Sequence, residues 1–326
     1  MTEMTLVEAV RAALARAMED DPAVLLLGED IGPDGGVFRA TEGLWQRFGR
    51  DRVRDTPLSE AGLAGAAVGL AVQGFRPVAE IQFQGFIHPA LDQIANHAAR
   101  MRNRTRGRLT CPLVLRAPFG AGVHAPEHHS ESIEALFAHI PGLKVVIPSS
   151  PAQAYGLLLS AIRDPDPVVF FEPKRLYRAS RQEVAEDGAG LPLGRASLLR
   201  QGRDLTIVTW GASVKECQEA AQDLAEGGIS AEILDLATLK PYDAPAVLAS
   251  VRKTGRCVIV HEAPRTGGFG AEIAACIAEE ALEALLAPVR RVAAPDIIPP
   301  LARLEHLYLP GAAQITAAAR EVMSWH

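Results

Sequence analysis

The chain has 326 residues, 48% of them hydrophobic and 22% charged, which is the composition of a globular protein and excludes disorder. Its formal net charge is −6, and no lysine- and arginine-rich block runs along one face, which excludes the usual basic nucleic-acid-binding protein. No apolar run reaches the roughly 18 residues of a membrane span. The first residues form neither a signal nor a transit peptide, and the four cysteines are scattered without a Cys-x-x-Cys pair. We therefore expect a cytoplasmic protein, with two domains because of its length.

Short apolar strands alternate with helices along the first 180 residues. A capping-box sequence at residues 5–8 predicts the first helix. The expected elements that follow are a strand at 24–27, a helix at 60–73, a strand at 78–83, a helix at 89–102, strands at 113–116 and 144–147, a helix at 152–162 and a strand at 168–171. This alternation predicts a mostly parallel, doubly wound α/β sheet.

A polar, glycine-containing stretch of low periodicity follows, and we interpret residues 181–203 as a linker. The pattern then resumes. The expected strands lie at 205–209, 231–236 and 257–260, and the expected helices lie at 214–225, 244–252, 271–286 and 313–323. The predicted architecture is therefore two doubly wound α/β domains, residues 1–180 and 204–326.

The run 55–62 carries the first candidate functional residue, Glu60. Pro57 favours extended backbone before it, and Ser59 is placed to cap the helix in whose first turn Glu60 lies. On these residues alone, the simpler explanation is a carboxylate that complements the helix dipole. The helix that follows is rich in glycine and alanine and has poor helix propensity. Such a helix indicates close approach by a partner helix or a ligand.

A loop at residues 120–132 carries His124, His128 and His129 beside Glu127. The spacing fits no standard helical zinc motif, so we favour over a metal site a loop that delivers an acid or a base to a cleft. A polar surface loop is the alternative. Farther along, Asp164 and Asp166 follow a helix end, where carboxylates and carbonyl oxygens suit a hard cation. A solvated turn is locally the simpler explanation for these two residues.

The glycine-rich turn at residues 267–270 follows a strand and opens a helix, a position that can bind phosphate. It matches neither Gly-x-Gly-x-x-Gly nor a Walker sequence. We therefore interpret it as a packing turn.

Several segments, taken together and in order, resemble one family. The residues concerned are Leu-Gly-Glu-Asp at 27–30, Thr-Pro-Leu-Ser-Glu at 56–60, Val-Ala-Glu-Ile-Gln-Phe at 78–83, His-Ser at 129–130, Gly-Leu-Lys-Val-Val at 142–146 and Phe-Glu-Pro-Lys at 171–174. They are similar to the beta subunit of the decarboxylating component of 2-oxo acid dehydrogenase complexes, and the likeness extends to residues 261–264 and 307–310. The run 172–178 most resembles branched-chain members, with pyruvate and acetoin members as the alternatives.

This resemblance implies an N-terminal domain of the thiamine-diphosphate pyrimidine-binding type and a C-terminal domain of the transketolase-like type. It implies that Glu60 hydrogen-bonds the aminopyrimidine N1′ of thiamine diphosphate, for which a buried setting that raises its pKa is suited. Leu58, Gln82 and Phe86 are implied to adjoin the cofactor, Phe86 standing where the family often has tyrosine.

The resemblance also implies two further sites. His129, or its neighbour His128, is implied to assist acyl transfer to a lipoyl group as an acid or base. A structural potassium ion is implied at a set of five residues, some of which act through main-chain oxygens. These residues are Leu113, Val114, Ala161, Asp164 and Asp166.

One motif of thiamine enzymes is missing from the sequence. No Gly-Asp-Gly is followed by the asparagine-bearing segment that binds magnesium and diphosphate. The resemblance implies that an alpha subunit supplies these ligands in an α2β2 heterotetramer, so we expect the lone chain to be inactive. With that subunit, the chain is expected to oxidise a 2-oxo acid and acylate the lipoyl group of an acyltransferase core. The rival hypotheses are a non-catalytic assembly scaffold and a nucleotide-binding α/β protein.

Overall fold

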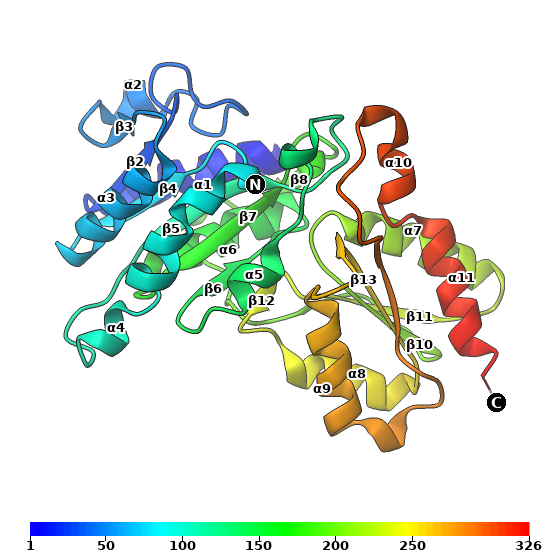
Figure 1. Ribbon diagram of the computed structural model, residues 1–326. Coiled ribbons are helices and arrows are strands. Elements are labelled where there is room, and N and C mark those ends of the chain that lie inside the picture. The colour runs from blue at the N-terminus through cyan, green and yellow to red at the C-terminus, as the bar shows by residue number, and fades with distance from the viewer. Residues whose placement is uncertain (326) are drawn as a thin grey trace. The chain divides into compact units, whose positions relative to one another are not determined.

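The computed structural model describes residues 1–325 and resolves two compact units, coloured mostly blue to green and yellow to red in Figure 1. The first unit comprises Met1–Phe119 and Leu136–Leu193, and the second comprises Gly120–Ala135 and the chain from Gly194 onward. This division differs from the single boundary expected at 181–203, because residues 120–135 group with the second unit. Two short strands, β8 (Gln182–Val184) and β9 (Ser197–Arg200), also lie within the expected linker.

The first unit is built on a parallel sheet. Across the sheet the strands run β6 (Lys144–Val146), β7 (Val168–Pro173), β5 (Val114–Phe119), β4 (Arg76–Glu80), β2 (Val24–Gly28) and β3 (Val53–Asp55). From β2 the chain goes to β3 on one side, and it then crosses to β4 on the other side. The point where the winding reverses, at the carboxyl ends of β2 and β4, is where ligands bind in sheets of this kind.

Helices cover this sheet. On one side α1 (Leu6–Asp20) packs against α6 (Pro151–Arg163), and elsewhere α3 (Glu60–Val72) packs against η1 (Gln84–Ala90) and η2 (Gln93–Ala98) (Figure 1). The capping box of α1 is confirmed: Glu8 N–H donates to Thr5 Oγ1 at 3.4 Å, and Thr5 N–H donates to Glu8 Oε2 at 2.8 Å.

The single helix predicted at 89–102 is wrong. A 3₁₀ segment (η1), a π segment (η2) and the short α4 (Met101–Arg104) occupy this region. The backbone is helical from η1 to the end of η2, but it is wound as a π-helix from Gln93 to Ala98 and turns at residues 99–100, so the segment is not one regular α-helix. The remaining short elements of this unit are β1 (Thr2–Met4), antiparallel to β8, with α2 (Leu44–Phe48) and η4 (Lys174–Leu176). The short α5 (Glu134–Ala138) begins in the second unit and ends in the first.

The second unit has its own, mostly parallel sheet. Its strands run β14 (Arg290–Ala294), β13 (Cys257–Pro264), β10 (Leu205–Thr209), β11 (Ala231–Asp235) and the antiparallel β9. The helix α7 (Ser213–Glu226) packs with α11 (Ala312–Met323), and α8 (Ala244–Thr254) packs with α9 (Gly270–Glu280) on the other face (Figure 1). Shorter elements are η3 (Glu127–His129), β12 (Thr238–Lys240), η5 (Leu282–Ala284), η6 (Ala302–Leu304) and α10 (Glu305–Tyr308). The expected class, two α/β domains of the doubly wound kind, is confirmed.

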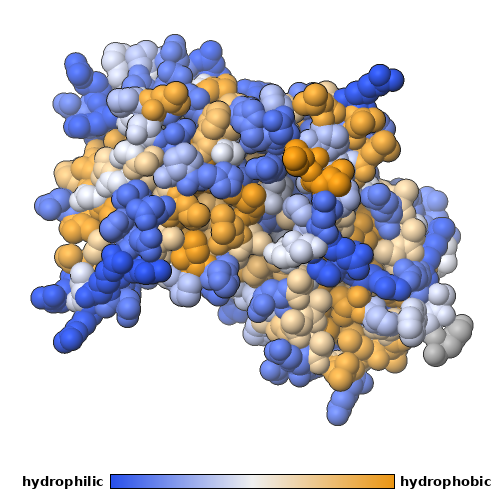
Figure 2. Space-filling model, viewed as in Figure 1, coloured by the Kyte–Doolittle hydropathy of each residue, from blue (hydrophilic) through white to orange (hydrophobic). Residues whose placement is uncertain are grey.

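Apolar side chains gather on the surface of the second unit beside α10 (Figure 2). The exposed large ones between β14 and α11 are Ile297, Ile298, Leu301, Leu304 and Leu307, each between 51% and 74% exposed. Exposed apolar patches commonly mark surfaces that bind another protein, a membrane or a ligand. Among the described residues, no helix is both long enough and apolar enough to cross a membrane.

Candidate active site

Glu60 is the first residue of α3, the helix that crosses from β3 to β4, and its side chain is half-buried. It therefore lies where the winding of the sheet reverses. The expected cap by Ser59 is wrong in one respect. Ser59 does occupy the N-cap position, but its side chain makes no capping hydrogen bond to the described residues.

The backbone of Ser59 is held by a second carboxylate instead. Glu29 directly follows β2, is 8% exposed, and accepts a hydrogen bond from Ser59 N–H. Burial, then the nearby Glu60 carboxylate and then Asp30 raise the pKa of Glu29. Glu60 therefore lies near a second acid, Glu29, whose protonated form is favoured. An acidic pair directly after a buried strand is the sequence signal that would have identified Glu29 as a site residue.

The other predicted cofactor residues lie on neighbouring elements. Gln82 follows β4, and its Nε2 donates to Asp30 Oδ2 at 2.9 Å, which links the ends of β2 and β4. Phe86 lies in η1, which packs on α3. Leu58 is 76% exposed, so an apolar side chain stands open to solvent two residues before Glu60. Leu58 is therefore exposed just before α3, Gln82 lies at the ends of β2 and β4, and Phe86 lies on a segment that packs on α3.

A buried ion cluster links β4 to two further strands of the same sheet, β5 and β7. Arg116 of β5 is 1% exposed, and its guanidinium contacts Glu172 of β7 at 2.6 Å and Glu80 of β4 at 2.7 Å. Tyr177 donates its hydroxyl proton to Glu172 at 2.7 Å. Burial opposes the charge on Arg116, but the Glu172 and Glu80 carboxylates outweigh it and raise the pKa of Arg116. Arg116 lies in the strand predicted at 113–116, but the sequence gives only one signal of the cluster, a charged residue within an apolar run.

The histidine-bearing loop belongs to the second unit. His128 is exposed and His129 is half-buried, and their ring centroids are 4.0 Å apart in η3. Glu127 Oε1 lies 3.7 Å from His128 Nδ1. No group of three or more His, Cys, Asp or Glu side chains able to hold a metal ion is found within residues 1–325. Two imidazoles therefore lie side by side in this loop, and imidazole is the side chain that exchanges protons near neutral pH.

Glu134, at the far end of this loop, is 1% exposed and accepts a hydrogen bond from Trp210 Nε1 at 3.2 Å. Burial raises the pKa of Glu134 to about 7. Trp210 also stacks on His261, with ring centroids 5.2 Å apart. Burial lowers the pKa of His261 to about 4. This part of the second unit therefore holds an acid and a base whose neutral forms are both favoured.

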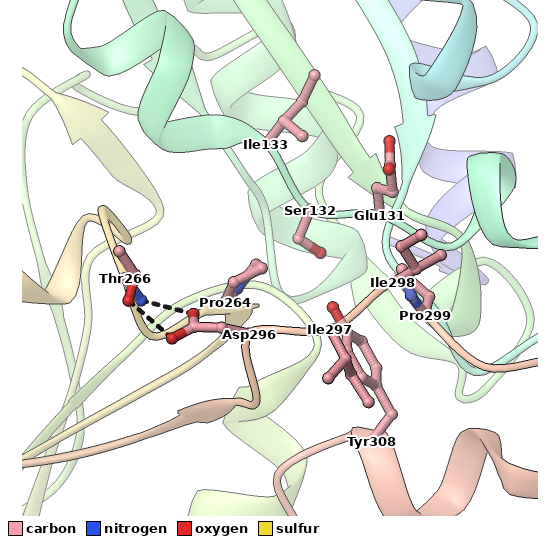
Figure 3. Close-up of a pocket in the computed structure, with 10 residues that line it drawn as sticks. All are labelled: Glu131, Ser132, Ile133, Pro264, Thr266, Asp296, Ile297, Ile298, Pro299 and Tyr308. Atoms are coloured by element: carbon pink, nitrogen blue, oxygen red, sulfur yellow. Dashed lines mark hydrogen bonds between the residues drawn. The ribbon is translucent and has the colours of Figure 1, made fainter.

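A cavity of about 490 Å³ opens beside the loop (Figure 3). Ser132 and Ile133 of the loop line it, together with Ile297, Ile298 and Tyr308. Its wall is closed at one side by Asp296, which accepts hydrogen bonds from the backbone N–H and the hydroxyl of Thr266, at 2.9 and 2.7 Å. The mostly apolar lining suits an aliphatic group or an apolar side chain.

The five predicted potassium ligands lie at the end of α6 and at or just before the starts of β5 and β7. Asp164 contacts Lys144 Nζ at 2.5 Å, and Asp166 contacts Arg102 Nε at 2.7 Å. The carbonyl oxygen of Ala161 accepts from Asp164 N–H at 3.3 Å. The carbonyl oxygen of Leu113 accepts from Val168 N–H at 2.9 Å, and Val114 begins β5. Both carboxylates are thus balanced by cationic side chains of the protein itself.

Comparison with known proteins agrees with this arrangement. Residues 2–180 match the family model of the transketolase pyrimidine-binding domain, and residues 194–315 match that of the transketolase C-terminal domain. The chain is 50% identical to the pyruvate dehydrogenase E1 component subunit beta of Bacillus subtilis (strain 168) over 325 residues, which cover 100% of both chains. It is 49% identical to the protein of the same name from Acholeplasma laidlawii over 322 residues, covering 99% of this chain and 98% of the other.

A solved structure described as a split-gene transketolase, in the form of an inactive beta4 tetramer, is similar over 99% of both chains. The TM-score is 0.83 and the identity is 25%. The fold, the position of Glu60 and the full-length similarity to E1 beta subunits lead to one conclusion. The chain belongs to the family of beta subunits of the E1 component of 2-oxo acid dehydrogenase complexes, which are oxidoreductase components.

Proposed function

We propose that this chain is the beta subunit of a thiamine-diphosphate-dependent pyruvate dehydrogenase. The observation that carries the proposal is the half-buried Glu60 at the start of α3, where the winding of the first sheet reverses. The relatives compared are named for pyruvate, so pyruvate has better support than the branched-chain substrate predicted from residues 172–178.

The residues around Glu60 fit the pyrimidine half of thiamine diphosphate. A carboxylate suits the ring nitrogen N1′, and the exposed Leu58 with the aromatic Phe86 suits the faces of a flat ring. The bound cofactor supplies an electron sink for loss of carbon dioxide from a 2-oxo acid. Glu60 would hold or share the proton at N1′. Glu29, through Ser59 N–H, would fix the backbone from which Glu60 extends.

The remaining half of the site belongs, on this proposal, to an alpha subunit that provides Mg²⁺ and the diphosphate ligands in a cytoplasmic α2β2 heterotetramer. The split-gene transketolase described as an inactive beta4 tetramer supports the expectation that one kind of chain alone lacks activity. The lipoyl group of an acyltransferase core would then receive the acyl unit, with His129 or His128 as the acid or base.

The proposal includes a potassium ion at Asp164 and Asp166, where two ion pairs are already present. Asp164 and Asp166 contact Lys144 and Arg102, so an ion would have to share or displace these contacts. Thermal unfolding of the chain in KCl and in NaCl of equal concentration tests it. A midpoint that rises in KCl supports the site, and equal midpoints contradict it.

The substrate is tested with the reconstituted heterotetramer. The chain is co-expressed with its alpha partner and assayed with pyruvate, acetoin and branched 2-oxo acids. We expect pyruvate to give the highest kcat/KM and the chain without its partner to give no turnover. A preference for branched 2-oxo acids would restore the alternative, and decarboxylation by the lone chain would contradict the two-chain site.

A further inference from the structure

A buried carboxylate anchors the histidine-bearing loop. Glu305, the first residue of α10, is 3% exposed. Its Oε1 accepts Gly122 N–H at 2.7 Å, and its Oε2 accepts His124 N–H at 3.1 Å. His124 Nδ1 lies 3.1 Å from the same Oε2. One carboxylate therefore binds two backbone amides of the loop, and hydrogen bonds to a charged acceptor are among the stronger ones in proteins.

The loop backbone is shaped to receive this anion. Gly120, Gly122 and His124 all have positive φ angles, of 83°, 91° and 59°. Alternating left-handed residues turn neighbouring N–H groups toward one point and form an anion-binding nest. His124 is not glycine, so its conformation is strained, and such strain persists where the surroundings enforce it. Glu305 fills the nest and provides that enforcement.

The rest of the loop is braced around the histidines. Gly120 N–H donates to the Glu131 carbonyl at 3.1 Å, which closes the base of the loop. Ser130 Oγ donates to the carbonyls of Ala125 and Pro126, at 3.2 and 3.1 Å. Tyr308, the last residue of α10, packs against Ala121. His128 and His129 thus lie within a closed loop whose first half is fixed by α10.

We propose that Glu305 is a positioning residue for acyl transfer, holding the loop so that His128 and His129 face the reacting group in a fixed orientation. This inference rests on the proposed function, in which these histidines serve that step. There the two-carbon unit is oxidised while the S–S bond of the lipoyl group is reduced. One sulfur bonds the acyl carbon as the S–S bond breaks, and the other sulfur takes a proton from a loop histidine. The hydroxyl proton of the two-carbon unit then passes to a base, and the bond between that unit and its carrier breaks with the electron pair left on the carrier.

The test compares two reactions of the reconstituted heterotetramer. Pyruvate oxidation with ferricyanide requires decarboxylation but no lipoyl group. Acetylation of an isolated lipoyl domain requires decarboxylation and also acyl transfer to the lipoyl group. Glu305→Gln keeps the size of the side chain but sets an amide in place of one acceptor oxygen. We expect it to lower kcat for lipoyl acetylation at least tenfold, with less than threefold change in the ferricyanide reaction. Glu305→Asp keeps both oxygens and should recover part of the loss.

Glu232 gives a matched control, because it is 3% exposed in the same unit and accepts Gly202 N–H at 3.2 Å, outside the loop. Glu232→Gln should leave the ratio of the two reactions unchanged. Hydrogen exchange of the peptide 120–132 reads the loop directly. Exchange should quicken in Glu305→Gln and, to a smaller extent, in Glu305→Asp, which also serves if the glutamine variant does not assemble.

Two results would overturn the inference: equal losses in both reactions, or unchanged exchange in the peptide. Failure of the proposed function is distinguishable from these. In that case the wild-type tetramer would not oxidise pyruvate with ferricyanide at all, and the exchange measurement, which needs no substrate, would still decide the role of Glu305 in the loop.

Discussion

Arg116 of β5 and Glu172 of β7 form a two-point ion pair inside the first sheet, with Nε–Oε1 and Nη2–Oε2 distances of 2.6 and 2.9 Å. Neither side chain is more than 2% exposed. Glu80 shares the same guanidinium from the other side. Two buried carboxylates therefore share one buried cation, which ties β4, β5 and β7 together inside the first sheet.

Replacing Arg116 by methionine should destabilise the first unit by about 3–5 kcal/mol, because it leaves uncompensated carboxylates in the core. Urea unfolding of the isolated chain measures the loss. Arg11→Met is the control. Its ion pair with Glu42 is 2.9 Å long but lies at the surface, so its loss should cost about 1 kcal/mol or less. Equal effects of the two substitutions would show that the buried cluster carries no special weight.

Replacing Glu60 by glutamine should lower the activity of the reconstituted enzyme by about 100-fold or more, since the amide cannot exchange a proton at the cofactor. Assembly and the thermal midpoint should not change, because the side chain is only half-buried. Glu272→Gln alters the first turn of another helix, α9, at an exposed position and should have no effect. Full activity of the Glu60 variant would favour the scaffold hypothesis over the catalytic one.

Glu134 should make stability depend on pH. Burial raises its pKa to about 7 from an unfolded value near 4.5. Between these values the folded carboxyl keeps a proton that the unfolded chain releases. The contribution of Glu134 to the free energy of unfolding is therefore complete below pH 4.5. It is lost as the pH rises from there through 7, by about 1.4 kcal/mol per pH unit.

The Glu134→Gln variant cannot titrate there, so its stability relative to wild type should increase from pH 5 to pH 8. Urea unfolding at several pH values measures this difference. The pKa of His261 is lowered to about 4, so its contribution has the opposite sign, with stability rising from pH 4 to 6.5. It is common to both proteins and cancels in the comparison. Parallel pH profiles would mean that Glu134 is ionised in the folded chain.

Gly69 allows the small-residue face of α3 to be tested. A Cβ at Gly69 would meet no described atom within 4 Å, and its helix neighbours Gly62 and Ala66 are also exposed. Gly69→Ala should stabilise the isolated chain by about 0.5–1 kcal/mol through helix propensity. If a partner packs on this face, the same change should weaken assembly of the tetramer. Thermal unfolding and analytical ultracentrifugation measure the two effects, and unchanged assembly would exclude close packing at Gly69.

Sequence patterns predicted the regular elements well where local forces decide the structure. The capping box at Thr5 and Glu8 and the apolar strand of β2 are examples, because each depends on residues adjacent in the chain. The helix predicted at 89–102 is divided into 3₁₀, π and α segments, and the contacts of η1 and η2 with α3, which local apolar spacing does not encode, accompany this irregular winding. The short edge strands β3 and β14 carried no clear local signal, because each is defined by its pairing with one neighbouring strand.

The candidate site was predicted in part. Glu60 could be identified because an ordered set of motifs surrounds it, whereas its own neighbours favoured an ordinary helix-start acid. Glu29 could have been identified from the acidic pair that follows β2, whereas Glu305 was missed because its role depends on backbone amides far away in sequence. Glu305 lies 183 residues from Gly122, and no local pattern encodes that distance.

The route of the chain between the two units limits how the protein can be divided. Because residues 120–135 group with the second unit, the backbone passes between the units three times, after Phe119, after Ala135 and after Leu193. A fragment that ends at Leu193 would contain His128 and His129 but not Glu305. The remaining C-terminal fragment would contain Glu305 but not the two histidines. If the gene were divided at Leu193, the loop of the N-terminal fragment would have to dock on the C-terminal fragment to restore the native second unit.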